Sequence, residues 1–287
     1  MVSFAHQTRT DILRTIALRC SLSAAASFFL ICLCSCQVPS KAERGKKDPT
    51  LAAATPHSQR PPAGLEGPTW DKIRNTPPQS PGVGNRDSYS SVSTSLPFIA
   101  LTFDDGPHPT HTPRLLDILK ARNVKATFYV VGTNAKRYPE ILRRMIAEGH
   151  EIGNHTITHG SITKMSPDQI RHELSVSHQT ILEATGIPPR TMRPPYGAIR
   201  SDQKAWIRRE FGYPSIMWNV DPEDWKKPGS SVVTQRLVSG ARPGGILLVH
   251  DIHEPTIDAI PSAVDQLLRK GFQFVTVTQL IAMDGKG

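Results

Sequence analysis

The amino-acid sequence predicts an α/β fold with a parallel sheet, in a region of about 190 residues that begins near Phe98. Two observations predict it. Short β-prone runs alternate with amphipathic stretches of helical spacing, and polar clusters follow several of these runs, where α/β proteins carry their functional sites. Because a full eight-fold barrel typically needs about 250 residues, the length leaves a smaller or distorted barrel, or an open sheet.

The first half of this region alternates three strands with three helices. Pro97 suits the position before a first strand, where no ladder N–H is needed, and leucines at helical spacing indicate the helix that follows. Gly149 ends the second helix, and Ser166 opens the third. The expected strands are 98–103, 125–131 and 151–153, and the expected helices are 113–121, 140–148 and 167–184.

The second half continues the alternation with shorter apolar runs. Strands are expected near Met192 and over 216–220, 246–249 and 273–277. Helices are expected over 202–210, 231–239 and 257–270. Each predicted strand before the last is followed by either a helix or a polar loop, which is the pattern of parallel βα units.

The amino-terminal third is predicted to lie outside this fold. Arginines precede an apolar run over residues 20–35, so residues 1–36 are interpreted as a secretory signal or a membrane anchor. The run ends in Leu33-Cys34-Ser35-Cys36, which resembles a bacterial lipobox with Cys36 as the lipidated residue. Residues 37–97, rich in Pro and Ser, are interpreted as a disordered tether, and 98–284 as a catalytic domain. We therefore expect an exported protein, either attached to the cell envelope or secreted.

Charge and cysteine content exclude other classes. The formal net charge is +9, but the basic residues are spread without a recognition motif, so no nucleic-acid partner is expected. The four cysteines lie within the first 36 residues, so the predicted domain has no disulfide and no thiolate metal site.

Two adjacent carboxylates, Asp104 and Asp105, end the first strand before a Gly-Pro stop. Neighbouring residues on a strand point to opposite faces, so both can reach one site only if the strand ends and twists there. One carboxylate is then available as a metal ligand and the other as a proton acceptor.

His155 and His159 follow the short third strand and are four residues apart. That spacing brings both rings to one side of a turn. Two imidazoles and a carboxylate suit a divalent cation with a position left for water or substrate. We expect Zn²⁺, with Co²⁺ or Ni²⁺ as alternatives.

Three more polar clusters follow later strands. Arg193 and Tyr196 lie in a loop stiffened by two prolines, where Tyr196 has the first free N–H and Arg193 is available to a carboxylate. Asp224 and Trp225 follow the strand at 216–220, and His250 ends the strand at 246–249 as a candidate proton donor. All these clusters are expected to meet at one rim of the sheet.

Together the stretches TFDDGP, HTITH, RPPYG, DPEDW and LVH resemble the polysaccharide deacetylase family, carbohydrate esterase family 4. The resemblance covers residues 98 to about 280. It implies a distorted (β/α) barrel of about seven parallel strands and a metal-dependent hydrolase that removes acetyl groups.

The resemblance also implies a role for each matching residue. Asp104 would be the general base, held by an ion pair with Arg193, and His250 the general acid, supported by Asp224. The metal ligands would be Asp105, His155 and His159. Tyr196 would offer its backbone N–H to the oxyanion, and Trp225 and Leu248 would line the pocket for the acetyl methyl.

The expected activity is N-deacetylation of N-acetylglucosamine units in a polysaccharide, with peptidoglycan first and chitin-type oligomers next. Two alternatives stay open at this point: an O-acetyl esterase that acts on xylan-like glycans, and a carbohydrate-binding protein without turnover. We expect the chain to act as a monomer, with its amino-terminal segment as the contact with the membrane.

Overall fold

The structure is a computed structural model that describes residues 83–285. The predicted signal or anchor at 1–36, the lipidation site Cys36 and the tether as far as residue 82 lie outside the described residues. Within 83–285, no helix combines the length and the apolar character that crossing a membrane requires.

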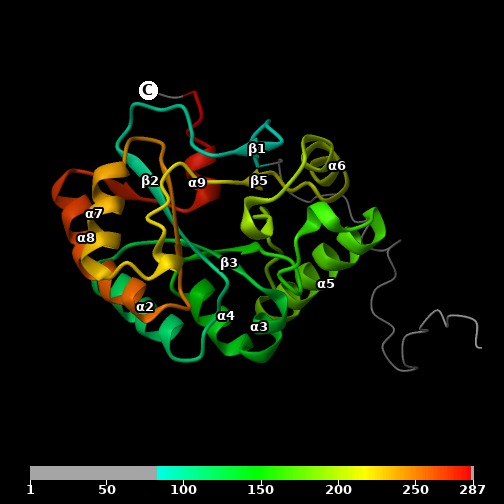
Figure 1. The fold of residues 1–287 in the computed structure, drawn as a ribbon, viewed down its shortest axis with the longest axis horizontal. Helices are drawn as coiled ribbons and strands as arrows, with labels where there is room; N and C mark the ends of the chain where they lie inside the picture. Colours follow the sequence, from blue (N-terminus) through cyan, green and yellow to red (C-terminus); the bar gives the residue numbers. More distant parts are fainter. Residues whose placement is uncertain (1–82, 286–287) are drawn as a thin grey trace, which may run out of the picture. The chain divides into compact units, whose positions relative to one another are not determined.

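A parallel sheet of strand order β4-β3-β2-β6 forms the centre of the fold, with β2 in its middle (Figure 1). The short strand β7 also pairs with the first two residues of β2. Each of these strands is parallel to its neighbour, as predicted. Their bounds are β2 Phe98–Asp104, β3 Thr127–Val130, β4 Glu151–Asn154, β6 Ile246–His250 and β7 Gln273–Phe274.

Single-residue bridges close this sheet on itself. Asn154 at the end of β4 pairs with Met192, which pairs in turn with Ser215 of β5 (Ser215–Ile216). A few residues later Val220 pairs with Leu247 of β6. All these pairings are parallel, so the fold is a barrel with irregular links on one side. This confirms the predicted distorted barrel, although the strand expected near Met192 is a single bridge and the strand expected at 216–220 is regular only at its start.

Helices cover the outside of the sheet (Figure 1), and their predicted positions are confirmed within a few residues. α5 starts with Ser166 and Gln169 in a capping box and ends at the left-handed Gly186. The bounds are α2 His111–Ala121, α4 Pro139–Ala147, α5 Pro167–Thr185, α6 Ser201–Phe211, α7 Ser230–Gly240 and α8 Glu254–Arg269.

Alternation along β2 separates the core from the site. Ile99, Leu101 and Phe103 are buried in the cluster that joins sheet and outer helices, and Phe103 stacks on Phe128 at 5.1 Å. Burying each such side chain contributes about 1.5–3 kcal/mol. The intervening residues, including Thr102 and Asp104, face the other side of the sheet. The apolar pattern thus holds β2 in place while its alternate side chains point toward the barrel interior.

The tether was predicted to run to residue 97, and the structure corrects this boundary. β1 (Ser88–Tyr89) pairs in parallel with β5, and Val83, Tyr89 and Val92 are buried. The hydroxyl of Tyr89 accepts hydrogen bonds from the N–H groups of Asn85 and Arg86. These residues carry no strand pattern of their own. They are ordered by pairing with β5, which lies more than a hundred residues away in sequence, so no local signal predicted them.

Two short helices were not predicted. α3 (Gly132–Arg137) is polar and short, so it shows no apolar periodicity. α9 (Val277–Ile281) begins at the residue expected to end the last strand, because Thr276 and Gln279 form a capping box there. The prediction that Val277 belongs to a strand is therefore wrong.

Candidate active site

The end of β2 brings both carboxylates to the same site. Asp104 is the last residue of the strand and is 4% exposed on the inner face. Asp105 has a left-handed backbone, with φ of 76°, so the chain turns directly after Asp104. This turn meets the condition that the sequence set for two neighbouring side chains to share one site.

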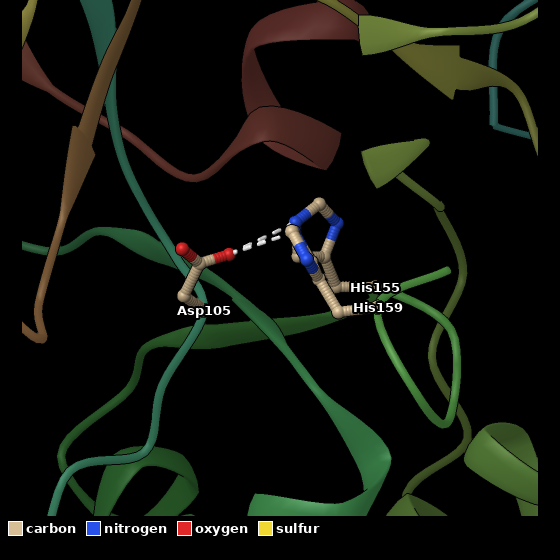
Figure 2. A group of neighbouring side chains, drawn as sticks. All are labelled: Asp105, His155 and His159. Atoms are coloured by element: carbon tan, nitrogen blue, oxygen red, sulfur yellow. Dashed lines mark ion pairs between the residues drawn. The ribbon is translucent and has the colours of Figure 1, made fainter. Parts of the chain in front are cut away.

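His155 and His159 lie in the loop after β4 and point toward Asp105 (Figure 2). Their Nε2 atoms lie 3.3 and 3.1 Å from Oδ1 of Asp105. The ligand atoms of these three residues all lie within 4.8 Å of one another. The predicted ligand set is therefore assembled from two loops that are about fifty residues apart in sequence.

The chemistry of these atoms fits a divalent cation. Nδ1 of His155 lies 2.7 Å from the carbonyl oxygen of Arg193, which can only accept, so Nδ1 carries the proton and Nε2 of the neutral ring presents a lone pair. Oδ1 of Asp105 is buried and has no hydrogen-bond partner among the described residues. Together with Nε2 of His159, these atoms offer a divalent cation three ligand atoms that converge on one point.

The charge on Asp105 suits the same role. Burial raises the pKa of Asp105, but its contacts with His155 and His159 lower it further, so that the pKa lies well below its ordinary range. The carboxylate is thus ionised near neutral pH.

Arg193 forms a buried ion pair with Asp104. Its Nη1 donates to Oδ1 of Asp104 and to Oγ1 of Thr102, both at 2.7 Å. Its Nε and Nη2 donate to the carbonyl oxygens of Ile216 and Met217. The guanidinium lies 4.3 Å from the ring centroid of Tyr129, and Arg193 is fully buried. A buried cation with every one of these contacts fixes the orientation of the Asp104 carboxylate.

His250, which is partly buried, pairs with the buried Asp224. Oδ1 of Asp224 lies 2.8 Å from Nδ1 of His250, and Oδ2 accepts from the backbone N–H of His250 and from Oγ1 of Thr256. Burial lowers the pKa of His250, but the hydrogen bond and charge of Asp224 outweigh it, together with the charges of Asp104 and Asp105, and raise the pKa to about 9. His250 is therefore positively charged near neutral pH, and its partner Asp224 has a lowered pKa.

The remaining predicted residues lie around this group. Tyr196 is 71% exposed, has φ of 61°, and its ring meets that of His159 edge-on at 4.7 Å. Trp225 is 51% exposed, with Nζ of Lys226 4.9 Å from its ring centroid. Leu248 is buried on the inner face of β6, two residues before His250. The structure thus places Tyr196 beside the histidines.

Backbone strain concentrates in these loops. Among residues 83–285, seven residues other than glycine have positive φ. Five of them belong to the site motifs: Asp105, Thr156, His159, Tyr196 and Glu223. Left-handed conformations cost of order 1–3 kcal/mol for such residues and persist only where surrounding contacts impose them.

Sequence reasoning missed residues that support the site from other elements. Thr102 shares Nη1 of Arg193 with Asp104, and Thr256 donates to Asp224. Asp251 is fully buried, accepts a hydrogen bond from Thr112, and has its pKa raised to about 7 by burial. Of these residues, only Asp251 had a signal in the sequence. A carboxyl group directly after a buried strand is expected to be either paired or functional, and Asp251 directly follows His250 at the end of β6.

Comparisons with known proteins agree with the geometry. The family model described as polysaccharide deacetylase matches residues 91–216. The peptidoglycan-N-acetylglucosamine deacetylase PgdA of Listeria monocytogenes is 41% identical over 182 residues, which are 63% of this chain and 38% of that protein. This chain therefore spans well under half the length of that relative.

Two other relatives are matched over nearly their whole length. A chitooligosaccharide deacetylase of Bradyrhizobium sp. is 37% identical over 210 residues, which are 68% of this chain and 95% of that protein. The solved structure "T48 deacetylase with substrate" has a TM-score of 0.62 at 43% sequence identity, over 65% of this chain and 91% of that one.

Proposed function

Because this chain belongs to the polysaccharide deacetylase family, we propose that it hydrolyses N-acetyl groups of N-acetylglucosamine units in a glycan of the cell envelope, with peptidoglycan as its substrate and chitin-type oligomers as the next choice. The single observation that carries the proposal is the meeting of Asp105, His155 and His159 beside two ion pairs, Asp104–Arg193 and Asp224–His250. Its relatives named above act on the same two kinds of glycan by name.

A divalent cation held by Asp105, His155 and His159, with Zn²⁺ first and Co²⁺ or Ni²⁺ as alternatives, would supply a Lewis acid to the acetyl carbonyl. The protein supplies the proton transfers. Asp104 is the general base that takes the proton of the attacking water, and Arg193 keeps its carboxylate oriented. The backbone N–H of Tyr196 donates to the oxyanion as it develops.

His250 acts as the general acid toward the leaving amine nitrogen. Amines are poor leaving groups unless protonated, and His250 carries the required proton near neutral pH because Asp224 raises its pKa. Trp225 and Leu248 are proposed to bound the space for the acetyl methyl group. We further propose that the amino-terminal segment exports the domain and holds it at the envelope, and that the catalytic unit is a monomer.

Acetate release from peptidoglycan and from chitooligosaccharides by the purified full chain tests this function. We expect release that a chelator abolishes and added Zn²⁺ restores, with peptidoglycan as the better substrate. Release from acetylated xylan in place of both would reassign the chain to the O-acetyl esterases. Glycan and metal binding without acetate release from any of the three would identify a carbohydrate-binding protein.

The Asp224–His250 pair predicts the alkaline limit of activity. We expect kcat/KM to fall as the pH rises through about 9, where His250 loses its proton. Asp224→Asn removes the charge that raises the pKa of His250, so the alkaline limb of the profile should move to lower pH. The measurement is a pH profile of acetate release for both proteins.

A matched control for this variant is Asp221→Asn, which changes an exposed carboxylate in the same loop. Its profile should coincide with that of the unaltered chain.

The Asp224–His250 pair also predicts how the stability of the fold depends on pH. The folded-state pKa of His250 lies above its ordinary value of 6.5, so the stabilisation is complete below pH 6.5 and is lost as the pH rises through about 9. Superimposable alkaline limbs for Asp224→Asn and the unaltered chain would contradict the assignment.

A further inference from the structure

The loop that carries both histidines has its backbone donors satisfied one by one. His155 N–H donates to Val130, and Thr156 N–H donates to the side-chain oxygen of Asn154. His159 N–H donates to Oγ1 of Thr156. Thr156 and His159 are both left-handed, so the loop adopts a conformation that its own residues disfavour.

The two donors between them are bound from a different element. Oε2 of Glu173, in the middle of α5, accepts the N–H groups of Ile157 and Thr158 at 3.1 and 3.0 Å. Its other oxygen, Oε1, accepts from Oγ1 of Thr158 at 2.7 Å. Glu173 is 6% exposed, and no cation is paired with it among the ion pairs of the described residues.

The opposite side of the loop is held as well. The carbonyl oxygens of Thr156 and Ile157 accept from the N–H groups of Gly132 and Thr133, at the start of α3. A Cβ at position 132 would lie 3.2 Å from the Cα atoms of Ile157 and Ser177, so glycine eases this close approach. The loop therefore lies between the start of α3 and a carboxylate of α5.

We propose that Glu173 is a positioning residue for the metal site: it holds residues 157 and 158 so that His155 and His159 face Asp105 before a cation binds. This inference rests on the metal site of the proposed function. A buried carboxylate costs free energy unless donors surround it, and here its three donors all come from the loop between the two ligands. Among residues 83–285, the hydrogen bonds of the Glu173 carboxylate all go to Ile157 and Thr158.

The physical consequence concerns metal affinity. Without an acceptor from α5, the N–H groups of Ile157 and Thr158 must find water, and the two left-handed residues can relax toward commoner conformations. The histidine nitrogens would then have to be brought together at the expense of binding free energy. Groups that orient metal ligands typically change metal affinity by about 10–100-fold.

The test uses the purified full chain stripped of metal, with Zn²⁺ affinity measured by competition with a chromogenic chelator. Glu173→Met keeps the volume and removes both acceptors. Glu173→Gln keeps one oxygen for the two N–H groups. Glu183→Gln is the matched control, because Glu183 lies on the same helix and bonds only the side chain of Gln179.

We expect Glu173→Met to weaken Zn²⁺ binding by about 10–100-fold. Glu173→Gln and Glu183→Gln should bind Zn²⁺ with nearly the affinity of the unaltered chain. The visible spectrum of bound Co²⁺ should change in Glu173→Met alone, since it reports ligand geometry. A role limited to packing α5 would instead lower the melting temperature of the metal-free protein and leave the affinity and the spectrum of the folded protein unchanged, which would overturn the proposal.

If Glu173→Met does not fold, the Zn²⁺ affinity of Thr158→Val is measured as the test in its place. This variant removes the donor to Oε1 without touching α5 and is expected to weaken Zn²⁺ binding measurably, so unchanged affinity would overturn the role of Glu173. Failure of the unaltered chain to bind Zn²⁺ or Co²⁺ would have a different meaning, because it would refute the metal site of the proposed function itself.

Discussion

Replacement of Asp104 by Asn is expected to lower the rate of acetate release by about 10²–10⁴-fold while Zn²⁺ binding is retained. The amide has nearly the shape of the carboxylate and can still accept from Nη1 of Arg193, but it cannot take a proton from water. The metal ligands proposed here are Asp105, His155 and His159, so the site for the cation stays intact. Rates are measured by acetate release at saturating Zn²⁺, and binding is measured by chelator competition.

His155→Ala provides the contrast, because it removes a ligand and should abolish both Zn²⁺ binding and turnover. A melting curve of Asp104→Asn shows whether the rate was lost through unfolding. Near-normal turnover by folded, Zn²⁺-loaded Asp104→Asn would mean that another group is the base. Loss of Zn²⁺ from this variant would instead make Asp104 a ligand; its Oδ2 lies 3.8 Å from Nε2 of His155.

The parts of the fold that could be predicted are those whose signal is local. β2 was predicted from a continuous apolar run and α8 from an amphipathic stretch, and the structure buries most of those apolar residues. β1 was missed because Ser88 and Tyr89 become a strand only beside β5. The end of the last strand was wrongly placed at Val277 because the apolar residues there are equally compatible with a strand. The capping box of Thr276 and Gln279 starts α9 at Val277 instead.

The same division applies to the site. Asp105, His155 and Arg193 lie directly after strands, so parallel topology alone predicts that they meet, and the structure brings them together. Glu173 could not be placed in this way, since it lies mid-helix and its partners are loop N–H groups that no sequence pattern marks. Its one signal was a carboxylate on the buried side of α5, between Ile170 and Leu174.

Replacement of Arg193 by Met is expected to reduce both stability and activity, with stability falling by about 3–5 kcal/mol. Removal of one member of a buried ion pair leaves the other uncompensated, and Asp104 is 4% exposed. The carbonyl oxygens of Ile216 and Met217 lose their donors at the same time. Thermal unfolding should show a fall in Tm on the order of 10 °C for a domain of this size.

Two further variants separate charge from geometry. Arg193→Lys keeps the charge, but an ammonium group cannot reproduce the fork that joins Asp104 to both carbonyl oxygens, so we expect an intermediate Tm and a kcat still well below that of the unaltered chain. Arg200→Met removes an exposed pair with Asp202, expected to be worth at most about 1 kcal/mol, and an exposed hydrogen bond to the carbonyl oxygen of Thr163. If Arg193→Met melted no lower than Arg200→Met, the pair would contribute little to the fold. If Arg193→Lys kept full activity, charge alone would orient the base, and the network of fixed hydrogen bonds around Asp104 would be unnecessary for catalysis.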